Sequence, residues 1–158
     1  MISLIAAVDS NFLIGKGDKL PWHYREDLLF FKKKVTNQNV LMGFNTYQSL
    51  KSYYKDKPFP FNKSYVASNS NILDSNVTRI SNLKSFLDKY KASKENIFVI
   101  GGSQIYQQSL EYVDVMYITH ILKRYQGDIF FPSFEYSKYW IKDKTIVPQL
   151  IFVTYIRK

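Results

Sequence analysis

The feature that most constrains the fold is an almost uniformly apolar run of strand length at the start of the chain, Ile2 to Val8, which Asp9 ends. A strand with one wet face alternates apolar and polar residues, whereas a continuous apolar run suits a central strand that is covered on both faces. A second such run, Asn96 to Ile100, follows much later. We therefore expect a sheet with helices packed on both sides.

The rest of the chain alternates between strand-like and helix-like segments. Further strands are expected over residues 39–42, 64–67, 77–80, 113–122, 140–147 and 150–157. Helices are expected over residues 24–35, 43–50 and 83–90 and after a cap at Ser103. The last two strands meet at Pro148-Gln149 as a hairpin. We predict an α/β fold in one domain over residues 1–158, with a mainly parallel sheet of about eight strands, an antiparallel C-terminal edge hairpin and about four flanking helices.

Composition argues against several kinds of site and partner. With no cysteine and two histidines, we expect neither a disulfide framework nor a metal site. The apolar opening is too short for a membrane span and lacks the basic start of a signal peptide, which favours a cytoplasmic protein without membrane contact. The formal net charge is +9, but the lysines are scattered and the run Lys32–Lys34 falls on the polar side of a helix. We expect no nucleic-acid partner, although the charge attracts small anions or a phosphate-bearing cofactor.

One acid lies beside an apolar helix face. Tyr24, Leu28, Phe31 and Val35 recur at helical spacing, and Asp27 lies at the edge of the face that they form. A carboxylate removed from water is costly unless a donor pairs with it or its pKa rises until it holds a proton.

The neighbours of Asp27 favour a functional carboxylate. Pro21-Trp22 before it and Phe31 after it supply aromatic walls. This environment suits a proton donor or a partner for a flat nitrogen heterocycle. The alternative is a partly solvated residue that pairs with Arg25 or a nearby lysine.

Two strand-to-helix turns are candidate phosphate sites. Gly43 precedes Asn45 and Thr46, and Gly101-Gly102 follows the second apolar run. Glycine lets a ligand approach the backbone, and amides at the start of a helix bind phosphate. The chain has neither a Rossmann Gly-x-Gly-x-x-Gly pattern nor a Walker lysine.

Together these segments resemble dihydrofolate reductase of the bacterial chromosomal type, in order and through nearly the whole chain. The motifs are Met1–Ala7, Ile14-Gly15, Leu20-Pro21-Trp22, Asp27-Leu28-x-x-Phe31-Lys32, Met42-Gly43-x-x-Thr46, Val99-Ile100-Gly101-Gly102-x-x-Ile105-Tyr106, Tyr117-x-Thr119-His120 and Gly127-Asp128-x-x-Phe131-Pro132.

The resemblance implies reduction of 7,8-dihydrofolate to 5,6,7,8-tetrahydrofolate by hydride transfer from NADPH, antifolate inhibitors as further ligands, and a monomer. Asp27 would hold the pterin's amino group and ring nitrogen, Thr119 would assist, and Trp22 would hold a water. Residues expected around the substrate are Ile5, Ala7, Leu28, Phe31, Lys32, Leu50, Ile100 and Tyr106. Residues expected around the cofactor are Ala7, Ile14, Gly43, Phe44, Asn45, Thr46, Ser68, Asn69, Gly101, Gly102, Ser103, Gln104 and Ile105.

The resemblance also implies two backbone features. The peptide bond between Gly101 and Gly102 is expected to be cis. The loop over residues 10–20, with Gly15 and Gly17, is expected to cover the carboxyl end of the first strand and to form a lid with the turn at Gly127-Asp128.

Several positions depart from the family pattern, among them Ile129, where threonine is usual, and three that bear on ligand binding. Phe44 and Gln104 stand where basic residues usually bind the cofactor's 2′-phosphate, so NADH use is possible. Asn62 stands where an arginine usually clamps the substrate's glutamate tail, with Lys32 or Lys63 as substitutes, and we expect weaker binding of that tail. Two alternatives stay open: a reductase of the same fold acting on a free pterin or a riboflavin-pathway pyrimidine, and a basic binding module without catalysis.

Overall fold

The first apolar run forms an inner strand of an eight-stranded sheet. The computed structural model describes residues 1–17 and 19–158. Strand β1 (Ile2–Val8) lies between β6 (Ile97–Val99) and β7 (Val115–Ile121) and is parallel to both. Its residues Ile2, Leu4 and Val8 expose no surface. The strand is therefore covered on both faces, as its composition predicts.

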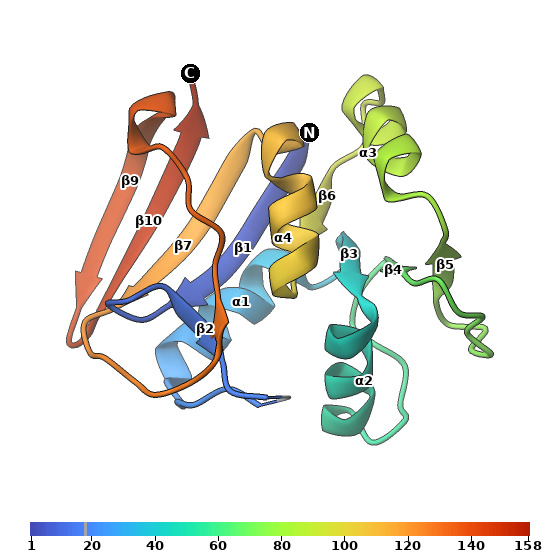
Figure 1. Cartoon of the computed structure of the whole chain (residues 1–158), viewed down its shortest axis with the longest axis horizontal. Coiled ribbons are helices and arrows are strands. Elements are labelled where there is room, and N and C mark those ends of the chain that lie inside the picture. Colours follow the sequence, from blue (N-terminus) through green and yellow to red (C-terminus); the bar gives the residue numbers. More distant parts are fainter. Residues whose placement is uncertain (18) are drawn as a thin grey trace.

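The sheet has the mixed topology expected from the sequence. Its strand order is β5-β4-β3-β6-β1-β7-β10-β9 (Figure 1). The remaining strands are β3 (Asn39–Gly43), β4 (Lys63–Ala67), β5 (Thr78–Ile80), β9 (Tyr139–Val147) and β10 (Leu150–Arg157). Strands β3, β4 and β5 join in parallel, whereas β10 is antiparallel to both β7 and β9. The predicted C-terminal edge hairpin is confirmed.

Four α-helices cover the two faces of the sheet: α1 (Arg25–Val35), α2 (Phe44–Tyr53), α3 (Leu83–Ala92) and α4 (Ser103–Ser109). Leu87 of α3 and Ile105 of α4 share one apolar core with β1. Val35 of α1 and Tyr47 of α2 belong to the opposite core, which β1 enters through Ile5. Figure 1 shows α4 in front of the sheet and α1 behind it. Short 3-10 turns at Leu110–Tyr112 and Tyr136–Lys138 complete the structure.

Several local predictions were wrong. Ser103 does not cap α4: the N-cap residue is Gly102, and the Ser103 hydroxyl instead donates to the carbonyl of Phe130 at 2.8 Å. Tyr24 is the N-cap residue of α1 with an extended backbone, so it lies outside the helix. Helix α2 extends beyond Leu50 to Tyr53.

The loop over residues 10–20 contains a strand that the sequence analysis missed. Strand β2 (Leu13–Gly15) pairs with β8 (Ile129–Phe130) in a separate two-stranded sheet. The predicted lid segment is therefore partly regular. Asp18, which belongs to the same loop, lies outside the described residues.

Candidate active site

Asp27 lies in the first turn of α1 with its side chain partly buried, facing β7. Burial raises the pKa of this carboxyl above its ordinary value, while a hydrogen bond with the Thr119 side chain acts in the opposite direction. Thr119 is 1% exposed, so this contact is shielded from water. The predicted pair of Asp27 and Thr119 is thus assembled, and an acid of this kind holds a proton more readily than an exposed carboxylate.

Trp22 carries an unpaired donor. The indole ring is 8% exposed, and its Nε1 is buried without a hydrogen-bond partner among the described residues. A buried N–H that lacks an acceptor is costly, so the site suits a water or a ligand atom that accepts this bond. That fits the water-holding role expected for Trp22.

The apolar walls meet around the core that α1 and α2 share with the sheet. Ile5 and Ile100 are buried there, and Phe31 and Leu50 pack against them with partly exposed side chains. The Tyr106 hydroxyl donates to the carbonyl of Ile5 at 2.8 Å. Four of the expected substrate residues therefore share one cluster. Leu28 is half-buried and lies outside the described clusters.

The glycine turns pack tightly together at the carboxyl ends of β3 and β6. The amide of Gly43 donates to the carbonyl of Gly101 at 2.8 Å, and the peptide bond from Gly101 to Gly102 is cis, as expected. A Cβ added to Gly43 would lie 2.9 Å from Ile105, and one added to Gly101 would lie 3.3 Å from the Thr46 hydroxyl. Side chains at positions 43 and 101 would crowd these neighbours. Glycine at both positions leaves the backbone open to a ligand, which suits a phosphate cradle.

Phe44 and Gln104, which stand where the family usually has basic residues, lie on exposed surface beside this cradle. Phe44 is 38% exposed, and its ring centroid lies 6.0 Å from that of Tyr47. Gln104 is exposed at the start of α4. The side chain of Arg79 donates to the carbonyls of Ser68 and Asn69, both at 2.9 Å. The guanidinium therefore supports the loop that carries these two expected cofactor residues.

Asn62 is exposed, but its side-chain amide is engaged within the protein. Its side-chain amide donates to the Asn39 side chain at 2.8 Å, and Asn39 in turn donates to the Tyr90 hydroxyl at 3.3 Å. Lys32 takes no part in this chain of hydrogen bonds, and its ammonium lies 3.4 Å from the Tyr53 hydroxyl. The structure thus shows an inward hydrogen-bond chain at the position where the family has its arginine clamp.

The two predicted lid segments touch. The amide of Gly17 donates to the Asp128 carboxylate at 2.9 Å, and the amide of Asp128 lies 3.3 Å from the carbonyl of Gly15. A Cβ added to Gly127 would lie only 2.6 Å from that same carbonyl. The close approach of the segments explains why glycine occupies this position.

Sequence reasoning missed two residues of this region. Asp9 ends the first apolar run, but it is also 2% exposed and accepts three backbone hydrogen bonds. Tyr125 was not singled out, although its ring packs on Trp22. An acid placed directly after a buried strand is a usable sequence signal, whereas nothing local marks Tyr125.

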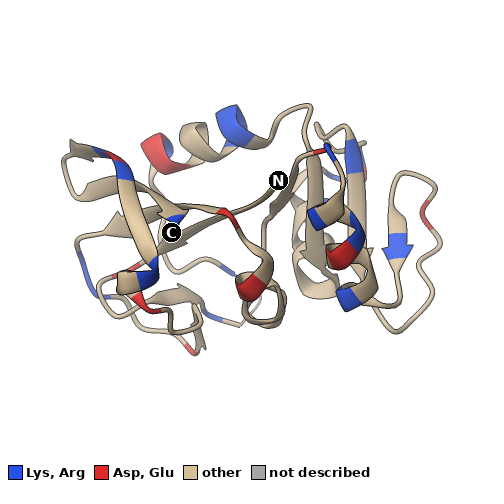
Figure 2. Cartoon of the chain, turned by 90° about the horizontal axis from the view of Figure 1, so that it is seen from above, with Lys and Arg blue, Asp and Glu red and all other residues tan. Residues whose placement is uncertain are grey.

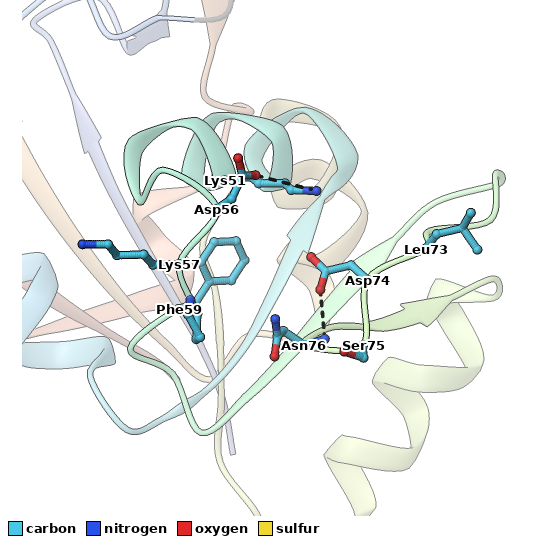
Figure 3. A pocket seen from close by; sticks show the side chains of 9 residues that line it. Lys51, Asp56, Lys57, Phe59, Leu73, Asp74, Ser75 and Asn76 are labelled. Carbon is cyan, nitrogen blue, oxygen red and sulfur yellow. Dashed lines mark hydrogen bonds and ion pairs between the residues drawn. The ribbon is translucent and has the colours of Figure 1, made fainter.

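Charged residues also line a cavity that lies apart from Asp27. In this cavity of about 380 Å³, Lys51 of α2 pairs with Asp56, and Asp74 accepts from the amide of Asn76 (Figure 3). Asp74 also accepts from the Tyr47 hydroxyl. Across the described ranges, no group of three acids or histidines is placed to hold a metal ion. No helix in the described part of the chain has the length and apolarity needed to cross a membrane.

An open α/β sheet with candidate binding residues at the carboxyl ends of its strands is typical of nucleotide-dependent enzymes. A family model described as dihydrofolate reductase matches residues 1–149. The chain belongs to the dihydrofolate reductase family.

Individual relatives agree with this assignment. The dihydrofolate reductase of Buchnera aphidicola from Acyrthosiphon pisum is 37% identical over 139 residues, which cover 88% of this chain and 83% of the relative. That of Bacillus subtilis is 38% identical over 140 residues, covering 88% and 80%. A solved dihydrofolate reductase from Enterococcus faecalis, complexed with NADP(H) and RAB-propyl, superimposes with a TM-score of 0.86 at 24% identity, covering 100% of this chain and 96% of that one. This last likeness concerns the fold.

Proposed function

We propose that the chain reduces 7,8-dihydrofolate to 5,6,7,8-tetrahydrofolate with NADPH as the hydride donor. The observation that carries the proposal is the partly buried Asp27, which is hydrogen bonded to Thr119 and has a raised pKa. Family membership supports the same reaction. The buried Nε1 of Trp22, which has no hydrogen-bond partner among the described residues, adds a donor.

The chemistry requires one hydride and one proton. NADPH, when bound, supplies the hydride to the substrate ring, which must also take up a proton. Asp27 binds the amino group and ring nitrogen of the pterin and so fixes its orientation, and the raised pKa of the carboxyl favours its protonated form. Ile5, Phe31 and Leu50 exclude water from the faces of the ring.

The cofactor would lie along the strand ends that carry the glycines. Gly101, Gly102 and the first turn of α2 at Asn45 and Thr46 offer backbone amides to the pyrophosphate, which the tight packing of these turns supports. Ala7 and Ile14 would contact the nicotinamide. Antifolates that carry an amino-substituted heterocycle would use Asp27 in the same way as the substrate.

Asp27→Asn tests the reaction. General acid assistance is worth roughly 10² to 10⁴ in rate, so we expect single-turnover hydride transfer to fall by about that factor while NADPH still binds. Asp88→Asn, which changes an exposed acid on α3, is the matched control and should leave the rate unchanged. Near wild-type turnover of folded Asp27→Asn at neutral pH would overturn the assignment.

We propose in addition that the enzyme discriminates weakly between NADPH and NADH. Phe44 and Gln104 offer no positive charge, and the Arg79 guanidinium is engaged with two loop carbonyls. Phe44→Arg should therefore raise the kcat/KM ratio for NADPH over NADH. Asn96→Arg adds the same charge before β6, at the other end of the sheet, and should leave the ratio as it is; a strong wild-type preference for NADPH would refute the proposal.

The second candidate is a same-fold reductase of a heterocycle without a glutamate tail. It is favoured by the inward hydrogen bond of Asn62 to Asn39. If it is right, a tail-less dihydropterin and dihydrofolate should be reduced with similar kcat/KM. A large preference for dihydrofolate would exclude it and would mean that a residue other than Asn62, with Lys32 and Lys63 as the candidates, binds the tail. Membership of a reductase family leaves the non-catalytic basic module without support.

A further inference from the structure

One aromatic side chain joins the lid to the elements that carry Trp22 and Asp27. Tyr125 lies between β7 and β8, and its hydroxyl is 2.5 Å from the hydroxyl of Tyr24. Its ring centroid lies 5.4 Å from that of Trp22. Tyr24 is the N-cap residue of α1, and Asp27 lies in the first turn of the same helix. Tyr125 therefore contacts the segment before α1 at two points.

The start of α1 depends on such contacts. The Tyr24 side chain makes no capping hydrogen bond to the helix, so the first turn lacks the local support that a serine or aspartate would supply. The Tyr24 hydroxyl is instead committed to Tyr125. Burial first, and then this hydrogen bond, raises the pKa of Tyr24 to about 12, so the hydroxyl keeps its proton at neutral pH.

The backbone of Tyr125 is held by a buried acid. Oδ1 of Asp9 accepts from the amides of Asn11 and Leu13, both at 2.8 Å, and Oδ2 accepts from the amide of Tyr125 at 2.8 Å. Hydrogen bonds to a carboxylate are stronger than those between neutral groups. Asp9 directly follows β1, whose residue Ile5 lies in the apolar wall of the site. The position of Tyr125 is thus fixed relative to the sheet.

We propose that Tyr125 is a positioning residue for the reduction: anchored by Asp9, it holds Trp22 and the first turn of α1 and so sets where the Asp27 carboxyl lies. This inference rests on the proposed function. Tyr125 acts through Trp22 and Tyr24 and takes no part in the chemistry itself. Small displacements of positioned groups lower reaction rates strongly, so loss of this contact should affect hydride transfer more than cofactor binding.

The first test removes the hydrogen bond from each side. Tyr125→Phe and Tyr24→Phe keep both rings and delete one hydroxyl each. Because they break the same bond, we expect each single variant and the double variant to lower single-turnover hydride transfer by the same factor, about 2- to 10-fold, with an unchanged dissociation constant for NADPH. Tyr136→Phe, which deletes an exposed hydroxyl near β9, is the control and should behave as wild type.

The second test follows Trp22 without measuring activity. The chain has two tryptophans, so Trp140→Phe leaves Trp22 as the only one, and Trp140 itself is 62% exposed. In this background Tyr125→Phe should shift the fluorescence of Trp22. Asp9→Asn should shift it in the same direction, because the amide keeps one oxygen for Asn11 and Leu13 but faces the Tyr125 amide with a donor.

The outcomes separate the two proposals. Wild-type rates in both tyrosine variants, additive losses in the double variant, or unchanged Trp22 fluorescence would each overturn the positioning role. Absence of dihydrofolate turnover in the wild-type protein would overturn the proposed function instead. The fluorescence of Trp22 would still report whether Tyr125 holds it.

Discussion

The Asp27 carboxyl, which we propose is needed for activity, is expected to lower the free energy of unfolding at neutral pH. Burial raises its pKa, so the folded chain binds this proton more readily than the unfolded chain, and the free energy of unfolding falls as pH rises through the raised pKa. Asp27→Asn removes that charge. We expect the variant to be more stable than wild type at pH 7, with a difference that shrinks toward pH 3.8, the ordinary value of the group.

Urea denaturation at the two pH values measures this difference. The exposed Asp88→Asn variant controls for a general change in net charge. An Asp27→Asn variant that is less stable than wild type at pH 7 would show that the carboxylate is held by compensating contacts, and that burial does not govern its pKa.

The same residue shows how far sequence reasoning reaches at this scale. The place of Asp27 beside an apolar helix face could be predicted from spacing. Its role toward a substrate came only from the family resemblance. The contact between Tyr24 and Tyr125 joins positions 101 residues apart, and no local pattern encodes it. The side-chain hydrogen bond of Asn62 likewise depends on Asn39, which belongs to a neighbouring strand.

At the scale of elements, the pairing of β2 with β8 makes Gly127 sensitive to substitution. An alanine Cβ there would lie 2.6 Å from the carbonyl of Gly15 and 2.9 Å from the Leu13 side chain, and the first of these atoms is backbone. We expect Gly127→Ala to push the two segments apart, lowering the free energy of unfolding by about 1–3 kcal/mol and slowing hydride transfer. Denaturation and single-turnover assays measure both effects.

Gly17→Ala is the matched control for that variant. Gly17, unlike Gly127, has a positive φ, of 59°, and an added Cβ there meets no atom within 4 Å. Its cost should be limited to the backbone preference, about 1 kcal/mol. Equal losses in the two variants would argue that the close approach of β2 does not explain the glycine at position 127.

Helices and strands could be predicted from the sequence where their own residues show a recognisable pattern. The long apolar runs and the C-terminal hairpin were found because burial on both faces, or alternation around a turn, is visible locally. Strands β2 and β8 have three and two residues, which is too short for any periodicity, and they exist because distant segments pair. Ser103 resembled a helix cap, but its hydroxyl is used by β8.

At the scale of the whole molecule, the two apolar cores share β1. Leu4 lies in one core and Ile5 in the other, so loss of this strand would disrupt both. We expect residues 1–158 to unfold as one domain, with coincident transitions by circular dichroism and tryptophan fluorescence. We also expect a monomer, which sedimentation would measure. Two separate transitions would show that the cores are independent.

The net charge of +9 makes a further prediction about the intact enzyme. Lys and Arg are distributed over well-separated elements on both flanks of the molecule (Figure 2), so they create a diffuse attractive field and no single binding patch. NADPH carries several negative charges, and salt shortens the range of this attraction to about 3 Å at 1 M. We expect kcat/KM for NADPH to fall several-fold between low and high salt while kcat stays constant. A salt-independent kcat/KM would mean that local contacts at the glycine turns govern capture of the cofactor, and that the charge serves solubility alone.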